Sequence, residues 1–446
     1  VGYFGLFDFG LSRALTKLVA DKLGEGQIHQ IPSLIWTCLM MMGGMAIVGT
    51  IVTFALSPWL VQSLMKVPAN LRGESLHAFY WLSVSIPIVV LTAGMRGALE
   101  ALQQFRLATA IRIPLGIFTY LGPVLVLPFS HSLVPIVVAL VAARALACIA
   151  HFWACCRVLP ELGSSFRLDR SSAGPLFRFG TWMSVSNVVG PVMVTFDRFV
   201  IGSMISVSAV AYYAVPSEII LKLLIFPAAL IGVMFPAFST AHSGQRSRVP
   251  FLFESSVKLI CVSMFPLLLA IVVFAPEGLR LWLGADFARN STWVVRCLAM
   301  AIFICSLAQV PFAYLQSIGR PDITAKLHVT ELPFYLAALF FLVRADGIRG
   351  AALAWALRVA MDAILLFFFS RKLSPENRFV TTKVPFLMAG GVFLFLLGTV
   401  PMPPEIKLFG LALSVVLCGV LLWHWVLSPR QKSLLISQLR GTHATG

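Results

Sequence analysis

Residues 33–57 read SLIWTCLMMMGGMAIVGTIVTFALS, a continuous run that contains no charged side chain. An α-helix needs about 20 apolar residues to cross roughly 30 Å of hydrocarbon, so this stretch predicts a transmembrane helix. The whole chain follows the same pattern, because its 446 residues are 59% hydrophobic and 12% charged. A soluble domain carries about 25% charged residues. The composition therefore excludes a water-soluble globular protein and predicts an integral membrane protein.

Apolar runs of similar length recur along the chain, and β-barrel strands would instead alternate polar and apolar residues over about ten positions. The predicted fold is thus an all-α polytopic membrane protein with twelve complete spans. Their approximate limits are 33–57, 79–99, 108–128, 133–157, 180–204, 208–236, 255–275, 292–318, 325–343, 348–370, 384–402 and 406–428.

The distribution of basic residues predicts an orientation. Alternate connections and tails between the spans hold 22 Lys and Arg residues, and the six intervening connections hold 7. The positive-inside rule places the richer side, and with it the C-terminus, in the cytoplasm. Most of the formal net charge of +16 is then topological. We therefore expect contact with anionic membrane lipid and no nucleic-acid partner.

The cysteines predict neither a metal site nor a disulfide framework, since no Cys-x-x-Cys or Cys/His spacing appears. All eight fall in or at the ends of apolar spans, and we expect them to be buried as small apolar side chains. They are Cys38, Cys148, Cys155, Cys156, Cys261, Cys297, Cys305 and Cys418. We expect no metal and no cofactor.

An internal repeat divides the spans into halves. Phe54-Ala55 and Phe274-Ala275 end matching spans, and each leads into a span with a central proline, Pro87 or Pro311. Six spans separate the matching elements, so the repeat is parallel. The first half lacks partners for two later spans. We therefore expect about one and a half helices before Val1, and a parent of fourteen spans.

The expected start and division of the chain follow from this repeat. No initiator Met is present, and Val1–Phe9 has the character of the end of a span. The segment Leu11–Gly24 places Arg13, Lys17 and Lys22 along an apolar helix, as an interfacial helix would. The predicted domains are an N-terminal lobe with a truncated start (1–158), a cytoplasmic inter-lobe linker (159–179), a C-terminal lobe (180–371), an extra helix pair (384–428) and a cytoplasmic tail (429–446).

Ionisable residues within the spans are the candidate functional residues, because a charge at the centre of a span costs about 2.5–3.5 kcal/mol on insertion scales. Asp197 and Arg198 are consecutive, about 100° apart around a helix, so they cannot pair along it. Two other pairs have i, i+4 spacing, which lets side chains meet on one helix face. The complete set is Arg144, Asp197, Arg198, Glu218, Lys222, Arg296, His328, Glu331, Arg358 and Asp362.

Two interpretations of these residues remain open. In the first interpretation, the two residues of each i, i+4 pair neutralise each other so that the span can enter the membrane; the pairs are Glu218 with Lys222 and Arg358 with Asp362. In the second, the ionisable residues line a water-filled cavity between two lobes. In the span 208–236, three prolines open backbone groups that then require a cavity or a neighbour. Parallel repeats, proline-broken spans and ionisable residues at mid-membrane depth are typical of a secondary transporter that works by alternating access. We favour this second interpretation.

Several stretches resemble the bacterial polysaccharide transporters, the oligosaccharide flippases of the multidrug/oligosaccharidyl-lipid/polysaccharide exporter superfamily. The resemblance runs from residue 1 to about residue 370. The stretches that carry it are GLFDFGLSRALT (5–16), FDRFVIG (196–202), AYYAVP (211–216), FPAFS (235–239), GRP (319–321) and GAALAW (350–355), the last followed by Arg358 and Asp362.

The resemblance implies a two-lobed, V-shaped carrier in the bacterial inner membrane. Its cargo would be an undecaprenyl-diphosphate-linked oligosaccharide for O-antigen or exopolysaccharide, moved from the cytoplasmic to the outer leaflet. Arg and Lys side chains would satisfy the phosphates through charge-assisted hydrogen bonds. The candidate substrate-binding residues are Arg198, Lys222, Arg144, Arg358 and Arg320, and the candidates for coupling to a proton or sodium gradient are Asp197, Glu218, Asp362, Glu331 and His328. The expected partners are the lipid-linked oligosaccharide and the polymerase and glycosyltransferases of its pathway.

Two alternatives compete with a flippase. A drug/cation antiporter shares the architecture, but its cavity should be rich in carboxylates, and the intramembrane residues here are at least as basic as acidic. A membrane polymerase or ligase should place catalytic residues in a large outward loop, and the predicted outward loops are short. We therefore expect a transporter and not an enzyme.

Overall fold

The computed structural model describes residues 9–59, 61, 72–128, 130, 132–164, 166–373, 378–400 and 402–421. These residues form helices and turns, with no β-strand among them. The predicted all-α fold class is confirmed. The expected stump at Val1–Phe9 lies almost wholly outside the described residues, and the expected tail at 429–446 lies entirely outside them.

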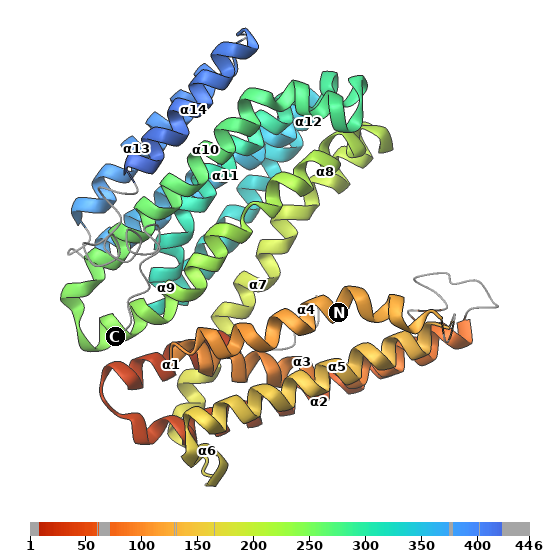
Figure 1. Cartoon of the computed structure of the whole chain (residues 1–446), viewed down its shortest axis with the longest axis vertical. Helices are drawn as coiled ribbons and strands as arrows, with labels where there is room; N and C mark the ends of the chain where they lie inside the picture. The colour runs from red at the N-terminus through yellow and green to blue at the C-terminus, as the bar shows by residue number, and fades with distance from the viewer. Residues whose placement is uncertain are drawn as a thin grey trace, which may run out of the picture. The chain divides into compact units, whose positions relative to one another are not determined.

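Fourteen labelled α-helices follow one another along the described chain (Figure 1). They are α1 (Leu11–Gly24), α2 (Ile31–Trp59), α3 (Arg72–Ala101), α4 (Phe105–Val126), α5 (Leu133–Val158), α6 (Pro160–Ser164), α7 (Arg170–Met204), α8 (Val207–Lys222), α9 (Ile225–Gly244), α10 (Val249–Leu283), α11 (Ala285–Ser317), α12 (Pro321–Leu373), α13 (Arg378–Gly398) and α14 (Pro404–Leu421). Short 3-10 helices precede α2 (Ile28–Gln30) and α10 (Arg246–Arg248).

Nine helical stretches in the described part of the chain are long and apolar enough to cross a membrane. The protein is therefore a multi-pass membrane protein. The expected spans within the described residues are helical, except that 208–236 is divided between two helices. Several helices extend beyond the expected limits: α7 begins at Arg170, inside the segment expected as a linker. The number of spans remains a prediction.

The longest helix, α12, contains two expected spans. Its backbone leaves the helical region at Asp346 (φ −140°, ψ 24°) and Gly347 (φ 56°, ψ −133°), so the 53-residue stretch is two helices joined by a tight turn. A Cβ atom at Gly350 would collide with the carbonyl oxygen of Leu342. Glycine at these positions allows the positive φ and the close backbone approach that a tight turn requires.

The span expected at 208–236 is interrupted once, between α8 and α9. The helix ends at Lys222 and resumes at Ile225. Pro227 lacks an N–H group, and in a continuous helix its ring would clash with the carbonyl of Leu223; it lies instead in the first turn of α9. Pro216 and Pro236 lie inside continuous helices.

The described chain forms two compact units. Unit 1 comprises residues 1–188, 235–246 and 317–325, and unit 2 comprises residues 189–234, 247–316 and 326–446. The C-terminal end of α9 and the turn between α11 and α12 therefore belong to unit 1. The lobe limits expected from the sequence stay a prediction.

In unit 1, helix α3 packs against α1, α2 and α5 (Figure 1). Small residues allow a close approach: a Cβ at Gly97 would lie 2.7 Å from Oγ1 of Thr16, and that hydroxyl donates to the Gly97 carbonyl at 3.1 Å. Helix α1 forms over the expected segment and buries one side, which includes Leu15 and Val19. Its interfacial position remains a prediction.

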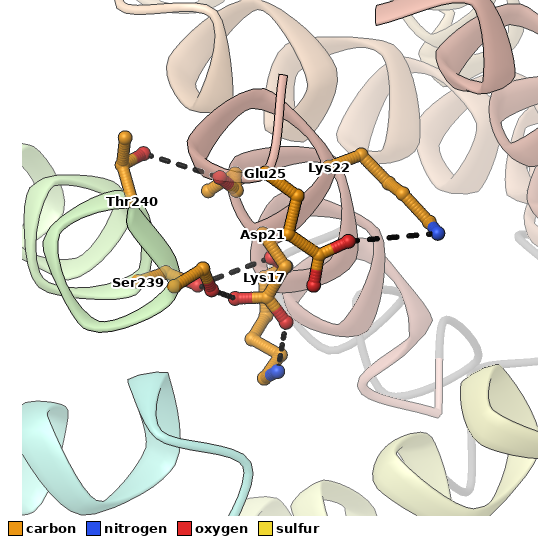
Figure 2. A network of polar contacts seen from close by, with 8 residues as sticks. Lys17, Asp21, Lys22, Glu25, Ser239 and Thr240 are labelled. Carbon is orange, nitrogen blue, oxygen red and sulfur yellow. Dashed lines mark hydrogen bonds and ion pairs between the residues drawn. The ribbon is translucent and has the colours of Figure 1, made fainter. Parts of the chain in front are cut away.

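The last turns of α9 bind α1 through a polar network that Figure 2 shows. The Asp21 carboxylate accepts hydrogen bonds from Ser239 Oγ at 2.6 Å and Ser243 Oγ at 2.9 Å, and it pairs with Lys17. Thr240 Oγ1 donates to the Ala20 carbonyl at 3.3 Å. These contacts tie together segments more than 200 residues apart in the sequence.

Unit 2 has an aromatic core in which α10 packs against α13 and α14. The Phe395 ring lies 5.0 Å from Phe265 and 5.3 Å from Phe303, centroid to centroid. These offset and edge-on arrangements suit the ring quadrupoles. The predicted extra helix pair is thus packed on the C-terminal half.

Candidate functional site

Asp197 and Arg198 on α7 have separate surroundings. Asp197 is 3% exposed and accepts a hydrogen bond from the hydroxyl of Tyr213 on α8 at 2.6 Å. Its other oxygen accepts from the backbone N–H of Arg198 at 2.7 Å. A buried carboxylate needs such donors to offset its desolvation. The two adjacent residues therefore do not pair with each other through their side chains.

The guanidinium of Arg198 instead donates to Glu218 on α8 at 2.8 Å. Glu218 is exposed, with 61% of its side chain accessible. The i, i+4 spacing of Glu218 and Lys222 does not produce an ion pair, and the exposed Lys222 has none within the described residues.

The two arms of α12 bring further ionisable residues together. Glu331 and Asp362 each stand 15 positions from the Asp346–Gly347 break, on opposite arms. In an antiparallel helix pair, residues equidistant from the turn lie at the same height, here about 22 Å from the tip. The two carboxyl groups interact electrostatically with each other and with Arg358. The sequence spacing predicted contact of Asp362 with Arg358, but no ion pair within 4.0 Å forms between them in the described chain.

Arg358 occupies an aromatic cradle. Its guanidinium carbon lies 5.9 Å from the ring centres of both Tyr335 and Trp355, within the range of cation–π attraction. Tyr335 stands 11 positions before the break and Arg358 stands 11 positions after it. Arg358 Nη1 also contacts Met193 Sδ at 3.5 Å.

Several polar atoms of this cluster have no hydrogen-bond partner among the described residues. They include Nε of Arg358, the hydroxyl of Tyr335 and Nδ1 of His328, whereas the carboxyl groups of Glu331 and Asp362 are close enough to share a hydrogen bond. Glu331 is 1% exposed, and the His328 ring stacks on Phe312 with centroids 5.6 Å apart. Buried polar atoms without partners are costly, so the cluster has capacity for a further proton, ion or water.

These residues form one buried polar cluster in unit 2, since Tyr335 interacts electrostatically with both Asp197 and Arg358. We call the set Asp197, Tyr213, His328, Glu331, Tyr335, Arg358 and Asp362 the unit 2 cluster. Among the described residues no group of three or more His, Cys, Asp or Glu side chains is arranged to hold a metal ion. The chemistry of the cluster suits a proton or a singly charged cation held by carboxylates and phenol oxygens.

The remaining predicted cations have hydrogen-bond partners outside the residues of this cluster. Arg144 in unit 1 donates to the Leu140 carbonyl of its own helix at 2.9 Å, and Arg296 in unit 2 donates to the Val272 carbonyl at 3.0 Å. Arg320, in the turn before α12, donates to both oxygens of Asp322 at 3.0 and 3.2 Å. This pairing raises the pKa of Arg320 above its usual value.

Sequence reasoning missed the two tyrosines of the cluster. Tyr213 lies in the AYYAVP stretch, but nothing in that stretch distinguishes it from the neighbouring Tyr212. Tyr335 and Glu331 could have been matched to Arg358 and Asp362 by counting outward from Asp346–Gly347. That count requires knowing that the chain reverses there.

The fold and the buried charges define a polytopic membrane protein of the transporter type. Residues 4–242 match the family model described as "Polysaccharide biosynthesis protein". The chain is also 30% identical over 367 residues to the "Putative O-antigen transporter" of Shigella flexneri, covering 82% of this chain and 86% of that one. This protein therefore belongs to the polysaccharide biosynthesis protein family.

A more distant relative is the "Probable low-salt glycan biosynthesis flippase Agl15" of Haloferax volcanii, 25% identical over 52% of this chain and 49% of its own. Solved structures with a similar fold include the Vibrio cholerae MATE transporter VcmN in its bent form (TM-score 0.74, 15% identity, 84% of this chain and 86% of that one). A MOP superfamily transporter from Pyrococcus furiosus is also similar (TM-score 0.69, 14% identity, 83% and 85%). At these identities the similarity shows the fold alone.

Proposed function

We propose that this protein is a flippase that moves a lipid-linked oligosaccharide from the cytoplasmic to the outer leaflet of the bacterial inner membrane. The similarity to the Shigella flexneri relative carries this proposal, because it extends over 86% of that chain and that relative is named as an O-antigen transporter. The named glycan flippase of Haloferax volcanii supports the same class. Transporter names among the relatives also support a role without catalysis.

The proposed cargo is linked through undecaprenyl diphosphate. A diphosphate with attached sugars cannot cross hydrocarbon unaided, and arginine side chains bind phosphate through strong bidentate hydrogen bonds. Arg198, Lys222, Arg144, Arg358 and Arg320 are the proposed contacts. Among them, Lys222 has no ion pair in the described chain, which leaves its ammonium group available to an anion.

An apolar groove of about 550 Å³ in unit 2 offers a place for the prenyl chain beside the extra C-terminal pair. It lies between α12 and α13 and includes Phe367, Phe393 and Leu396. Arg371 lies at its edge. A chain of apolar isoprene units fits such a lining by the hydrophobic effect.

We propose that the unit 2 cluster couples translocation to a proton or sodium gradient. Asp197 and Glu331 are buried, and Asp362 shares with Glu331 a hydrogen bond that requires one proton between the two carboxyl groups. His328 belongs to the same group, whereas the exposed Glu218 acts through its pair with Arg198. Glu331→Gln with Asp362→Asn should leave binding of cargo intact and abolish the dependence of translocation on the gradient.

A complementation assay tests the cargo proposal. Deletion of the gene should cause lipid-linked repeat units to accumulate on the cytoplasmic face, and the intact gene should restore surface polysaccharide. Arg198→Ala and Lys222→Ala should each lower surface polysaccharide at least about tenfold, because each removes a cation that neutralises phosphate. Arg280→Ala, an exposed cation of the same unit, is the matched control and should restore fully.

A drug/cation antiporter is the second candidate, favoured by the carboxylates of the unit 2 cluster. Dye efflux from cells that express the protein separates the two functions. Efflux that depends on Asp197 and Glu331, together with unchanged surface polysaccharide in the deletion strain, would replace the flippase proposal.

A further inference from the structure

Unit 1 contains a pocket of about 700 Å³ that is separate from the unit 2 cluster. Three segments line it: Lys17 and Leu18 of α1, residues 174–182 near the start of α7, and the turn 319–322 between α11 and α12. Its volume lies within the range of small-molecule sites, about 300–1,000 Å³. The three segments are far apart in the sequence, so the fold of unit 1 assembles this pocket.

The charged lining of the pocket is mainly cationic. Lys17, Arg178 and Arg320 come from the three different segments, and Asp322 contributes the one carboxylate named in the lining. Arg320 is bound by Asp322, and Lys17 pairs with Asp21. Arg178 is exposed and has no hydrogen bond or ion pair within the described residues. The pocket therefore offers an unused guanidinium next to two other cations.

Lys17 is held in place before any ligand arrives. Only 15% of its side chain is accessible, and its partner Asp21 is fixed by Ser239 and Ser243. In Figure 2 the Lys17 amino group extends from Asp21 on the side away from Ser239. A cation with a fixed rotamer loses little entropy when an anion binds.

The turn before α12 approaches this lysine closely. Gly319 has φ 80°, a conformation that glycine adopts without strain, and a Cβ there would lie 3.3 Å from Lys17 Cε. The approach places Arg320 beside Lys17. The turn also begins α12 at Pro321, and the N-terminus of a helix favours an anion through its free N–H groups.

The same pocket has an apolar side. Leu18, Phe179 and Trp182 line it, and Phe179 is 7% exposed. Tryptophan is enriched where protein meets the membrane–water boundary, because one end of its ring system is apolar and the other is polar. A ligand that matches this lining carries an anionic head and an apolar body.

We propose that this pocket binds the phosphate group of a membrane lipid, with Arg178, Arg320 and Lys17 as the phosphate ligands. The phosphate belongs to one of two sources. It is part of the diphosphate of the lipid-linked cargo, in which case the inference rests on the proposed function, or it is part of an anionic phospholipid headgroup, in which case the inference is independent of that function. The chemistry is the same in both cases. Release of Arg320 from Asp322 accompanies binding.

Calorimetric titration of the purified full-length protein tests this site with three probes. Farnesyl diphosphate represents the cargo head, dioctanoyl-phosphatidylglycerol represents a phospholipid, and inorganic pyrophosphate represents a free anion. One of the two lipids should bind the unaltered protein more tightly than pyrophosphate. Arg178→Gln with Arg320→Gln should raise its Kd at least about tenfold, as loss of charge-assisted hydrogen bonds predicts.

Two further variants keep the result interpretable. Arg167→Gln with Arg170→Gln removes the same charge from two exposed residues, one just before α7 and one at its first position, which do not line the pocket, and should leave Kd within about twofold. Asp322→Asn frees Arg320 from its carboxylate and should tighten binding, a gain that misfolding cannot produce. An unchanged Kd in the pocket variants would overturn the proposal, and so would an equal rise in Kd in the control variant. Pyrophosphate that binds as tightly as the tighter-binding lipid would overturn it as well.

The results of this titration also show whether the pocket and the proposed flippase function stand or fall independently. Binding of phosphatidylglycerol alone, lost in the pocket variants, supports a lipid headgroup site whether or not the protein moves glycans. Binding of farnesyl diphosphate in preference supports the cargo head. A failed titration together with successful complementation rejects the pocket and leaves the flippase intact.

Discussion

The carboxylate of Asp197 illustrates how a single residue determines the local structure of unit 2. It is nearly inaccessible, and among the described residues its one side-chain donor is the hydroxyl of Tyr213. A hydrogen bond to a charged group contributes about 1.5–3 kcal/mol, and a buried acceptor left without it incurs the full desolvation cost. The pair therefore fixes α7 against α8 as well as holding the carboxylate.

Replacing Tyr213 with Phe should lower the free energy of unfolding in detergent by about 1.5–3 kcal/mol, because it removes this donor from a buried carboxylate. The midpoint of thermal unfolding measures the effect. Tyr212→Phe is the matched control, since its ring packs on Phe287 and its backbone carbonyl, not its hydroxyl, accepts a bond from Ser291. Equal shifts for both variants would contradict the assigned role of the Tyr213 hydroxyl.

Gly244 provides a second test at the scale of one residue. A Cβ there would collide with the carbonyl oxygen of Gly24, where α9 meets α1 in unit 1. Gly244→Ala should therefore destabilise the protein by about 1–3 kcal/mol through overpacking, measured by thermal unfolding. At Gly232, earlier in α9, a Cβ meets nothing within 4 Å. Gly232→Ala should be neutral or slightly stabilising, since alanine favours helix.

For single residues, the sequence predicted which ionisable side chains lie within apolar spans, but it did not predict which residues they contact. Asp197 and Arg198 were expected to face different directions because consecutive helical residues lie about 100° apart, and they do. The partner of Arg198 is Glu218, which lies 20 positions away on another helix. Local spacing carries no information about such a contact, so only the packed structure reveals it.

Among the elements, α7 shows how a helix start is stabilised outside the membrane. Asp169 precedes the helix, and its carboxylate accepts from the backbone N–H of Ser171 at 3.0 Å and from the Ser171 hydroxyl at 2.6 Å. Its own N–H donates to Thr37 on α2 at 2.8 Å. These side-chain hydrogen bonds from Ser171 and Ser172 lower the pKa of Asp169 below its usual value.

Asp169→Ala should cost about 0.5–2 kcal/mol of stability at neutral pH, the usual effect of losing a helix cap. Because the folded pKa lies below the unfolded one, this stability is present above the unfolded pKa and is lost as pH falls through the folded value. The gap in unfolding midpoint between variant and parent should therefore narrow in acid. Glu25→Ala, at an exposed carboxylate 3.8 Å from Lys22, should show little change at either pH.

The spans were predictable from the sequence because a membrane helix requires a long apolar run, and no other structure satisfies its backbone in lipid. The interruptions were harder to place. Three prolines marked the span 208–236, but the break occurs only at Leu223–Leu224, before Pro227. Pro216 and Pro236 are accommodated inside helices, since neighbouring groups can satisfy a freed carbonyl.

For the whole molecule, the alternation of basic connections predicts a definite topology. Truncated fusions test it: fluorescent protein fused after Lys372 should fluoresce, and alkaline phosphatase there should be inactive, because this connection is expected in the cytoplasm. Fusions after Gly284 should give the reverse. Active phosphatase at both positions would contradict the predicted orientation and would require a different number of spans.

The division into two units was only partly readable from the sequence. The internal repeat indicated two halves, but it assigns residues 235–246 and 317–325 to the second half, whereas these segments pack in unit 1. Ser239, Ser243 and Arg320 belong to these segments. Ser239 and Ser243 contact Asp21 of α1, and Arg320 lines the same pocket as Lys17 of α1. Composition and periodicity give no information about partners this far away in the sequence.

The abrupt reversal of α12 also bears on how the chain is assembled during synthesis. Its arms are joined by a tight turn at Asp346–Gly347, so we expect them to enter the bilayer as one hairpin, with the charged residues Arg344, Asp346 and Arg349 near its tip. Glu331 and Asp362 become neighbours as soon as the arms close, because each is the same distance from the tip. We therefore expect Glu331 and Asp362 to form their hydrogen bond, and to interact with Arg358, before the later helices have been synthesised.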